Sequence, residues 1–171
     1  MKNSLKYVRT GLIVMAVMLV FILSFFIISS LTKEPAYAPD ITGVTADGKS
    51  LYSLSENLGK TGTLLVFFDH DTDKAVTAMQ LISQVAPEYD VDVMAVATGK
   101  GTIEEQIASL REKEITVFPH TLFDLKGEMA KTYNIGETPI LYFIDKNGMI
   151  TDAYIANITE KSLRKELKGI A

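Results

Sequence analysis

The sequence predicts an α/β domain, with a central mixed sheet flanked by helices, that follows one N-terminal transmembrane helix. Three observations lead to this fold class. Residues 11–31 are apolar and uncharged over the length of about 20 residues that a spanning helix needs. Strand and helix patterns alternate between residues 63 and 110, which is typical of a parallel crossover unit. Two more strand patterns, at 139–144 and 149–155, flank a tight turn and predict an antiparallel hairpin.

The N-terminal charges predict the orientation of the membrane helix. Lys2, Lys6 and Arg9 precede the apolar run, and no acidic residue does. Because positive charges stay on the cytoplasmic side, we expect residues 1–10 to be cytoplasmic and everything after residue 31 to be exported. The chain is therefore predicted to be a single-pass protein of the cell membrane whose C-terminal domain is extracytoplasmic.

A cleaved signal peptide is the alternative interpretation of this segment. The residues Ala36-Tyr37-Ala38 form a candidate cleavage site of the A-x-A type. The apolar run is longer than the core of a secretory signal, however, and Pro39 after the candidate site should hinder cleavage. The uncleaved anchor is therefore favoured. Residues 32–40 carry two prolines and no apolar period, so they predict a short, stiff tether before the domain at 41–171.

Charge and cysteine content exclude several classes of function. The net charge is −4, and removing the three basic residues before the apolar run leaves about −7 for the rest of the chain. An acidic exported domain does not suit a polyanion, so nucleic acid is not a predicted partner. The chain has no cysteine. It therefore has neither disulfides for stability nor a thiol for catalysis.

A hairpin and a helical turn are predicted at the start of the domain. The hairpin covers residues 41–52, with its turn at Ala46-Asp47-Gly48. Ser53 and Glu56 have the spacing of a capping box, which predicts a short turn of helix over residues 54–58.

The centre of the domain is predicted to be a strand, helix, strand and helix. Residues 63–68 and 91–98 are continuous apolar runs, as expected of strands covered on both faces. Residues 74–86 between them have a helical period, and Thr102 with Glu105 forms a second capping box that begins the next helix. The buried stripes of the two helices are predicted to be Ala75, Ala78, Met79, Ile82, Val85 and Ala86, and then Ile103, Ile107 and Leu110.

The last third of the domain is predicted to contain the hairpin and a terminal helix. An extended piece at 121–124 and a short helix through Tyr133 come first. Pro139 can stand only at the start of its strand, because it has no N–H for the ladder. The helix from 159 to 167 is predicted to end at Gly169.

The run Thr138-Pro139-Ile140-Leu141-Tyr142-Phe143-Ile144-Asp145, followed by Gly148, resembles the Thr-Pro strand of the thioredoxin-like superfamily. The resemblance is strongest to its membrane-anchored redoxins, the thiol-disulfide oxidoreductases that act in cytochrome c maturation. The hairpin at 41–52 is similar to the N-terminal extension of these redoxins. The resemblance covers roughly residues 39–170. It implies a thioredoxin-like fold with an N-terminal β-hairpin extension.

The resemblance also implies a site in which the two redox cysteines are missing. It places Thr72 and Ala75 at the two positions of the Cys-x-x-C motif, at the start of the helix after the central strand. With the peroxiredoxin branch as the template, the peroxidatic position falls near Ala75 or Val76, which are equally inert. The parts of the family site that this chain keeps are the helix N-terminus, with Thr72 as N-cap, and the Thr138-Pro139 pair on the opposite side of the cleft. In the family this proline is cis, and we expect a shallow peptide-binding groove with Thr138, Pro139, Thr72 and His70 as binding residues.

A metal site is the weaker interpretation of the loop before this helix. Asp69, Asp71 and Asp73 match the start of an EF-hand loop, but Lys74 and Gln80 stand where that loop needs glycine and glutamate. A solvated loop whose acids favour the helix N-terminus is sufficient, so these acids are weak candidates and no cofactor is predicted.

Two histidines complete the titratable candidates. A single histidine on a loop is more often a surface residue than a ligand, and His70 with His120 does not make a transition-metal site. His120 is a candidate for approaching the site that lost its cysteines.

Three functions are compatible with the sequence. The favoured hypothesis is a membrane-tethered, redox-inactive thioredoxin-like domain that acts as a binding or assembly module for a protein or peptide at the cell envelope. One alternative is a thiol-disulfide oxidoreductase, the activity that the family resemblance by itself would assign. The other is an enzyme with cysteine-free chemistry in the same cleft that uses Asp69, Asp71 or His70. Binding is favoured because a fold does not carry its function once the reacting atom is lost.

Overall fold

A computed structural model describes residues 36–171 together with Met15, Met18 and Leu19. The predictions for residues 1–10, for the span at 11–31 and for the first part of the tether therefore lie almost wholly outside the described residues. Among the residues described, no helix has the length and apolar character needed to cross a membrane.

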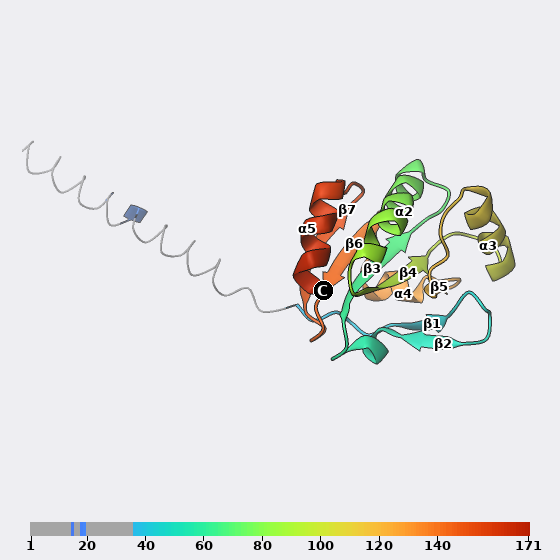
Figure 1. The fold of residues 1–171 in the computed structure, drawn as a ribbon, viewed down its shortest axis with the longest axis horizontal. Helices are drawn as coiled ribbons and strands as arrows, with labels where there is room; N and C mark the ends of the chain where they lie inside the picture. Colours follow the sequence, from blue (N-terminus) through green and yellow to red (C-terminus); the bar gives the residue numbers. More distant parts are fainter. Residues whose placement is uncertain (1–14, 16–17, 20–35) are drawn as a thin grey trace, which may run out of the picture. The chain divides into compact units, whose positions relative to one another are not determined.

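The domain follows the element order that the sequence predicts (Figure 1). The strands are β1 Thr42–Val44, β2 Leu51–Ser53, β3 Gly62–Phe68, β4 Val91–Ala97, β5 His120–Phe123, β6 Ile140–Ile144 and β7 Ile150–Ile155. The α-helices are α2 Asp73–Val85, α3 Ile103–Glu112, α4 Glu128–Thr132 and α5 Glu160–Ile170, and η1 Leu54–Asn57 and η2 Ala86–Glu88 are 3-10 turns.

The central sheet is mixed, as predicted, with the strand order β5-β4-β3-β6-β7. Strand β3 pairs in parallel with β4 and antiparallel with β6. Residues 64–68 of β3 and 93–97 of β4 are apolar and buried because both faces of the sheet are covered. The hairpin of β6 and β7 is antiparallel, and β1 and β2 form a separate two-stranded sheet.

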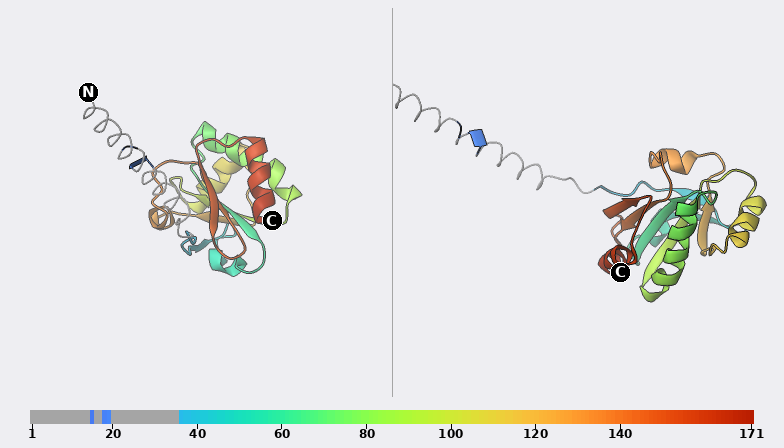
Figure 2. Two further views of the ribbon diagram at one scale, coloured as in Figure 1. Left: turned by 90° about the vertical axis from the view of Figure 1, so that its left-hand side faces the viewer. Right: turned by 90° about the horizontal axis from the view of Figure 1, so that it is seen from above.

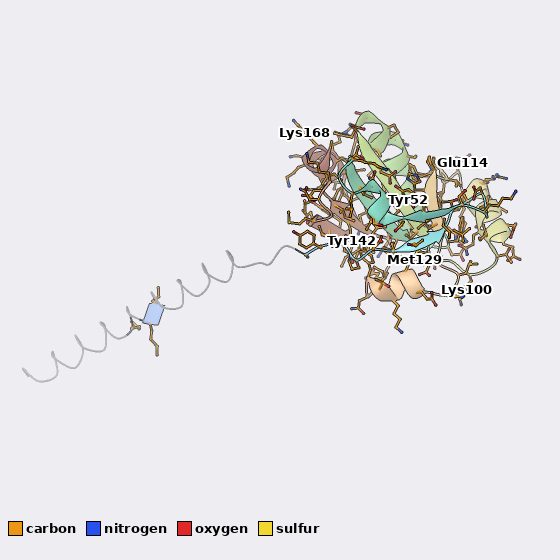
Figure 3. The ribbon with its side chains drawn as sticks, turned by 90° about the horizontal axis from the view of Figure 1, so that it is seen from below. Tyr52, Lys100, Glu114, Met129, Tyr142 and Lys168 are labelled. Carbon is orange, nitrogen blue, oxygen red and sulfur yellow. The ribbon has the colours of Figure 1, made fainter. Side chains whose placement is uncertain are left out.

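Alternate residues of the central strands point into two apolar cores. On one face, Leu64, Val66 and Phe68 of β3 pack with buried residues of α2 and α5. On the other face, Leu65 and Phe67 pack with the N-terminal segment and α4. Figure 2 shows α4 on the opposite side of the sheet from α2 and α5. In Figure 3, Tyr52, Met129 and Tyr142 are seen on this second face.

Local capping determines where the helices begin. The Thr72 hydroxyl accepts a hydrogen bond from the N–H of Ala75, which confirms Thr72 as the N-cap of α2. The predicted capping boxes of η1 and α3 are both present. The end predicted for the last helix is wrong, because α5 continues through Gly169 to Ile170. This glycine lacks the positive φ that would end a helix.

The folded unit also begins earlier than the sequence predicts. Its compact part starts at Ala36 rather than residue 41. Residues 36–38 run antiparallel to the start of β7, with Tyr37 opposite Met149. Backbone pairing of this kind is independent of side-chain pattern, so the composition of the tether did not reveal it.

Candidate functional site

The loop between β3 and α2 holds the first half of the candidate site. The carbonyl of Asp69 accepts hydrogen bonds from the N–H and the hydroxyl of Thr72, each at 3.1 Å. Thr72 is half-buried, whereas Ala75 is fully buried under the first turn of α2. The two positions at which the family resemblance implies cysteines thus hold a capping hydroxyl and a methyl group. Neither can be a redox nucleophile.

The approach to β6 holds the second half. The Thr138-Pro139 peptide bond is cis, as predicted. Pro139 is buried, and its carbonyl accepts a hydrogen bond of 2.7 Å from the N–H of Ala156. Thr138 is half-buried, and its own N–H and C=O take part in none of the loop, turn and cap hydrogen bonds within residues 36–171.

An ion pair joins the two halves. The Lys74 ammonium, in the first turn of α2, lies 3.7 Å from the carboxylate of Glu137, the residue before Thr138. Both side chains are exposed, so the pair contributes little to stability. It does place the start of α2 beside the chain that leads into Pro139, which is the arrangement expected of the cleft.

A cavity of about 210 Å³ opens beside this cleft, between α2 and the loop that joins β7 to α5. One wall is the exposed side of α2 and the other is the segment around Ala156, which is bonded to Pro139. The cavity is shallow and has both polar and apolar lining. Its lining residues are Asp73, Lys74, Thr77, Ala78, Leu81, Ala156, Asn157 and Ile158.

His70 is buried, so the expectation of a surface histidine is wrong. Only 4% of the residue is exposed, because its ring packs directly on Gly99, where even a β-carbon would collide with the imidazole. Its Nε2 lies 3.6 Å from the Asp71 carboxylate, and its Nδ1 has no hydrogen-bond partner within residues 36–171. The fully buried Gln106 has an unpartnered Oε1 and lines the same space around Gly99. The His70 side chain is therefore only 5% exposed, and its Nε2 edge is the one that faces the exposed Asp71 carboxylate.

The three aspartates of this loop serve separate local roles. Asp69 accepts a hydrogen bond from the N–H of Asp71, and Asp73 is the first residue of α2. The ammonium of Lys113 bonds Asp71 at 2.9 Å and lowers the pKa of its carboxyl. Across residues 36–171, no group of three or more His, Asp or Glu side chains is arranged to hold a metal ion.

A second polar cluster, which the sequence analysis missed, lies at the other end of the sheet. The Nδ1 of His120 lies 2.7 Å from one oxygen of Asp92, and the Tyr52 hydroxyl donates to the other oxygen at 3.2 Å. The Tyr52 and His120 rings are stacked, with centroids 3.6 Å apart. Burial and the nearby Asp92 carboxylate raise the pKa of Tyr52. The only sequence signal was an aspartate inside the apolar run of β4.

This cluster also corrects the expectation for His120. Asp92 lies opposite Thr63 at the beginning of β3, whereas the candidate cleft follows Phe68 at its end. His120 therefore does not approach the cleft.

Comparison with known proteins gives a consistent family and fold. A family model described as the AhpC/TSA family matches residues 36–153. The thiol-disulfide oxidoreductase ResA of Geobacillus kaustophilus is 24% identical over 150 residues, which cover 86% of this chain and 83% of that protein. The thioredoxin-like protein YneN of Bacillus subtilis is 28% identical over 138 residues, or 79% of each chain.

Solved structures share the fold. A putative thiol:disulfide interchange protein DsbE from Chlorobium tepidum superposes with a TM-score of 0.67 at 17% identity, covering 81% of this chain and 97% of that one. A putative protein disulfide isomerase from Bacteroides thetaiotaomicron gives a TM-score of 0.68 at 18% identity, with 81% and 89% covered. The thioredoxin-like fold predicted from the sequence is confirmed.

Proposed function

The chain belongs to the AhpC/TSA family, and we propose that it is a redox-inactive member, tethered to the membrane, that binds a protein or peptide segment outside the cytoplasm. One observation carries the proposal. Thr72 and Ala75 occupy the positions at which the family resemblance implies cysteines, in a chain without any cysteine, while the surrounding frame is intact. Disulfide exchange needs a thiolate, so the chemistry is lost while the surface remains.

The backbone of Thr138 supports an extended peptide as the bound segment. Its N–H and C=O are free of the turn and loop hydrogen bonds of the domain, so they are available to pair with another chain. The cavity beside α2 then receives a side chain of the bound segment, because it adjoins Pro139 through the Ala156 hydrogen bond.

Enzymatic alternatives have less support. ResA is named a thiol-disulfide oxidoreductase, but this chain has no sulfur nucleophile with which to form a mixed disulfide. Cysteine-free acid-base chemistry would use Asp69, Asp71 or His70. The His70 imidazole is packed against Gly99. The Asp71 carboxylate is bonded to Lys113, and the Asp69 carboxylate accepts a hydrogen bond from the N–H of Asp71. A general base must lie within hydrogen-bond reach of the proton that it abstracts.

The redox half of the proposal is tested with the purified full-length chain in detergent micelles. We expect no insulin disulfide reduction and no peroxide consumption above a buffer blank. The double variant Thr72→Cys with Ala75→Cys is the positive control, because it restores a dithiol at the helix N-terminus, where a thiol pKa is lowered. Turnover by the unmodified chain would contradict the proposal.

The binding half is tested by photo-crosslinking in intact cells. A photoreactive residue at Thr138 should give a discrete protein adduct, whereas the same residue at the exposed Lys168 of α5 should not. In the Thr138 background, Thr77→Arg should fill the cavity and abolish the adduct. Thr132→Arg is the matched control, because Thr77 and Thr132 are both exposed helix threonines that bond the carbonyl four residues earlier at 2.9 Å. Equal adducts in the two arginine variants would remove the cleft as the binding surface.

A further inference from the structure

The chain enters the domain at the end of the sheet opposite the cleft. The carbonyl of Ala36 accepts a hydrogen bond from the N–H of Ile150, and the N–H of Ala38 donates to Gly148, each at 2.8 Å. These bonds attach residues 36–38 to the turn between β6 and β7. The sheet therefore fixes the place of residues 36–38 in the domain.

The register of the sheet separates this entry point from the cleft. Ile144 at the end of β6 lies opposite Thr63, and Ile140 at its beginning lies opposite Phe67, next to the cleft. Four residue steps of a strand span about 14 Å at about 3.4 Å per residue. We call the end with Ala36 and Ile144 the tether end, and the end with Phe68 and Pro139 the cleft end.

The tether end has an exposed patch of apolar and basic side chains, made of Tyr37, Leu58, Lys60 and Lys146. Tyr37 is 64% exposed and Leu58 is 47% exposed, and both border one cavity of about 160 Å³. A hydrogen bond of 2.7 Å from the N–H of Gly59 to the carbonyl of Lys146 holds the two loops together. Both lysines are exposed, and neither is in an ion pair within residues 36–171.

The two acids nearest the patch are engaged in local hydrogen bonds. Asp40 accepts from the hydroxyl of Ser53 and the N–H of Ser55, and Asp145 accepts from the N–H groups of Asn147 and Met149. These bonds hold the two carboxylates against their own loops. The two carboxylates keep their charge but are oriented by these bonds, whereas the two lysines of the patch make no ion pair within residues 36–171.

The length of chain before Ala36 limits how far this patch can lie from a bilayer. Residues 32–35 separate the predicted span from Ala36, and four extended residues reach at most about 14 Å. The headgroup region of one leaflet is about 5 to 8 Å thick, half the difference between the whole bilayer and its hydrocarbon core. A domain on so short a connection has its tether end at the headgroups or just above them.

We propose that the Tyr37, Leu58, Lys60 and Lys146 patch rests on the phospholipid headgroups, so that the cleft faces away from the membrane. This inference rests on the membrane tether of the proposed function. Tyrosine suits the bilayer interface because it has an apolar ring and a polar tip, and lysine adds attraction to anionic lipids. The contact fixes the orientation of the domain and leaves Thr138 open to a partner in the extracytoplasmic space.

The test uses the absence of tryptophan from the chain. The full-length protein with Tyr37→Trp is reconstituted into phosphatidylcholine vesicles that contain a minority of phosphatidylglycerol, with nitroxide-labelled lipids as quenchers. The matched control is Ile155→Trp, because Ile155 is 58% exposed at the cleft end of β7. We expect headgroup-level nitroxide to quench the Tyr37→Trp fluorescence several-fold more strongly than that of Ile155→Trp. Adding Lys60→Glu and Lys146→Glu should reduce the quenching in these anionic vesicles.

The outcomes separate this inference from the proposed function. A chain that floats with the vesicles but shows equal quenching of the two tryptophans overturns the resting patch and leaves the tether intact. A chain that does not float with the vesicles overturns the tether and this inference together. Cleft crosslinking at Thr138 is independent of both results.

Discussion

The two ends of the central sheet differ in whether their buried polar groups are hydrogen-bonded. At the tether end, the amide of Asn57 donates to the Thr63 hydroxyl at 2.7 Å, and Asp92 bonds both Tyr52 and His120. At the cleft end, the Nδ1 of His70 and the Oε1 of Gln106 are buried and have no hydrogen-bond partner in the described part of the domain. A buried polar atom without a hydrogen bond costs stability, whereas a satisfied cluster does not. The polar cluster at the tether end is therefore satisfied, whereas the two unpartnered atoms at the cleft end carry a local stability cost.

The largest effect is expected from a glycine at the tether end. A β-carbon at Gly62 would collide with the backbone carbonyl of Ile170, at the end of α5. Because the colliding atoms belong to the backbone of a packed helix and not to the end of a flexible side chain, Gly62→Ala should lower the free energy of unfolding by about 3 kcal/mol or more. Urea unfolding of the domain measures it.

The matched variant at the cleft end is Gly99→Ala. Its β-carbon would meet the ring of His70, a side chain that can move. We expect a smaller loss, of about 1 to 2 kcal/mol. A larger loss for Gly99→Ala than for Gly62→Ala would show that the cleft end is the more tightly packed of the two.

The next largest effect is expected in the hydrogen-bonded cluster of Asp92, Tyr52 and His120. Asp92→Ala removes the acceptor of both Tyr52 and His120, so the free energy of unfolding should fall by about 2 kcal/mol. Asp90→Ala is the control, because Asp90 is an exposed acid just before the same strand and should change stability by less than about 0.5 kcal/mol. Similar values for the two variants would mean that the cluster contributes no stability.

The two histidines should respond with opposite sign. His120→Leu loses the bond to Asp92 and the stacking on Tyr52, and should destabilise by about 1 to 2 kcal/mol. His70→Leu removes a buried atom that has no partner, so stability should be unchanged or higher by about 0.5 kcal/mol. Urea midpoints of both variants measure the contrast. A clear loss for His70→Leu would show that its ring is satisfied in solution.

The smallest effect concerns acid stability. Partial burial raises the pKa of Asp145, but hydrogen bonds from Met149 and Asn147 outweigh it, and the net pKa is lowered. A carboxyl with a lowered folded pKa stabilises the protein above the unfolded pKa of about 3.9, and this contribution is lost as the pH falls through the folded value. Asp145→Asn should therefore flatten the dependence of the urea midpoint on pH below about pH 4.

Asp71 is the counterpart of Asp145 at the cleft end. Its lowered pKa comes first from the hydrogen bond with Lys113, and the carboxylate is solvent-exposed. We expect the effect of Asp71→Asn to disappear at high salt, because an exposed ion pair is screened. The effect of Asp145→Asn should persist, since its partners are backbone and amide groups. Equal salt sensitivity would contradict this distinction.

Local and periodic features of the chain were sufficient to predict the elements. The apolar runs of β3 and β4 and the stripe of α2 specify which faces are buried, and Thr72 and Thr102 cap the helices that they were predicted to cap. Such signals act within about four residues, which is why they can be read without a structure. The absence of cysteine excluded thiol chemistry by composition alone.

Contacts between distant residues decided the rest. His70 is buried because Gly99 and Gln106 enclose it, and Tyr52 reaches Asp92 across 40 residues of sequence. The sequence by itself determined the order of elements, the caps and the missing nucleophile, because each depends on residue type and short spacing. Only the tertiary structure decided which polar groups are satisfied and at which end of the sheet the tether enters, because both depend on how strands far apart in the chain align.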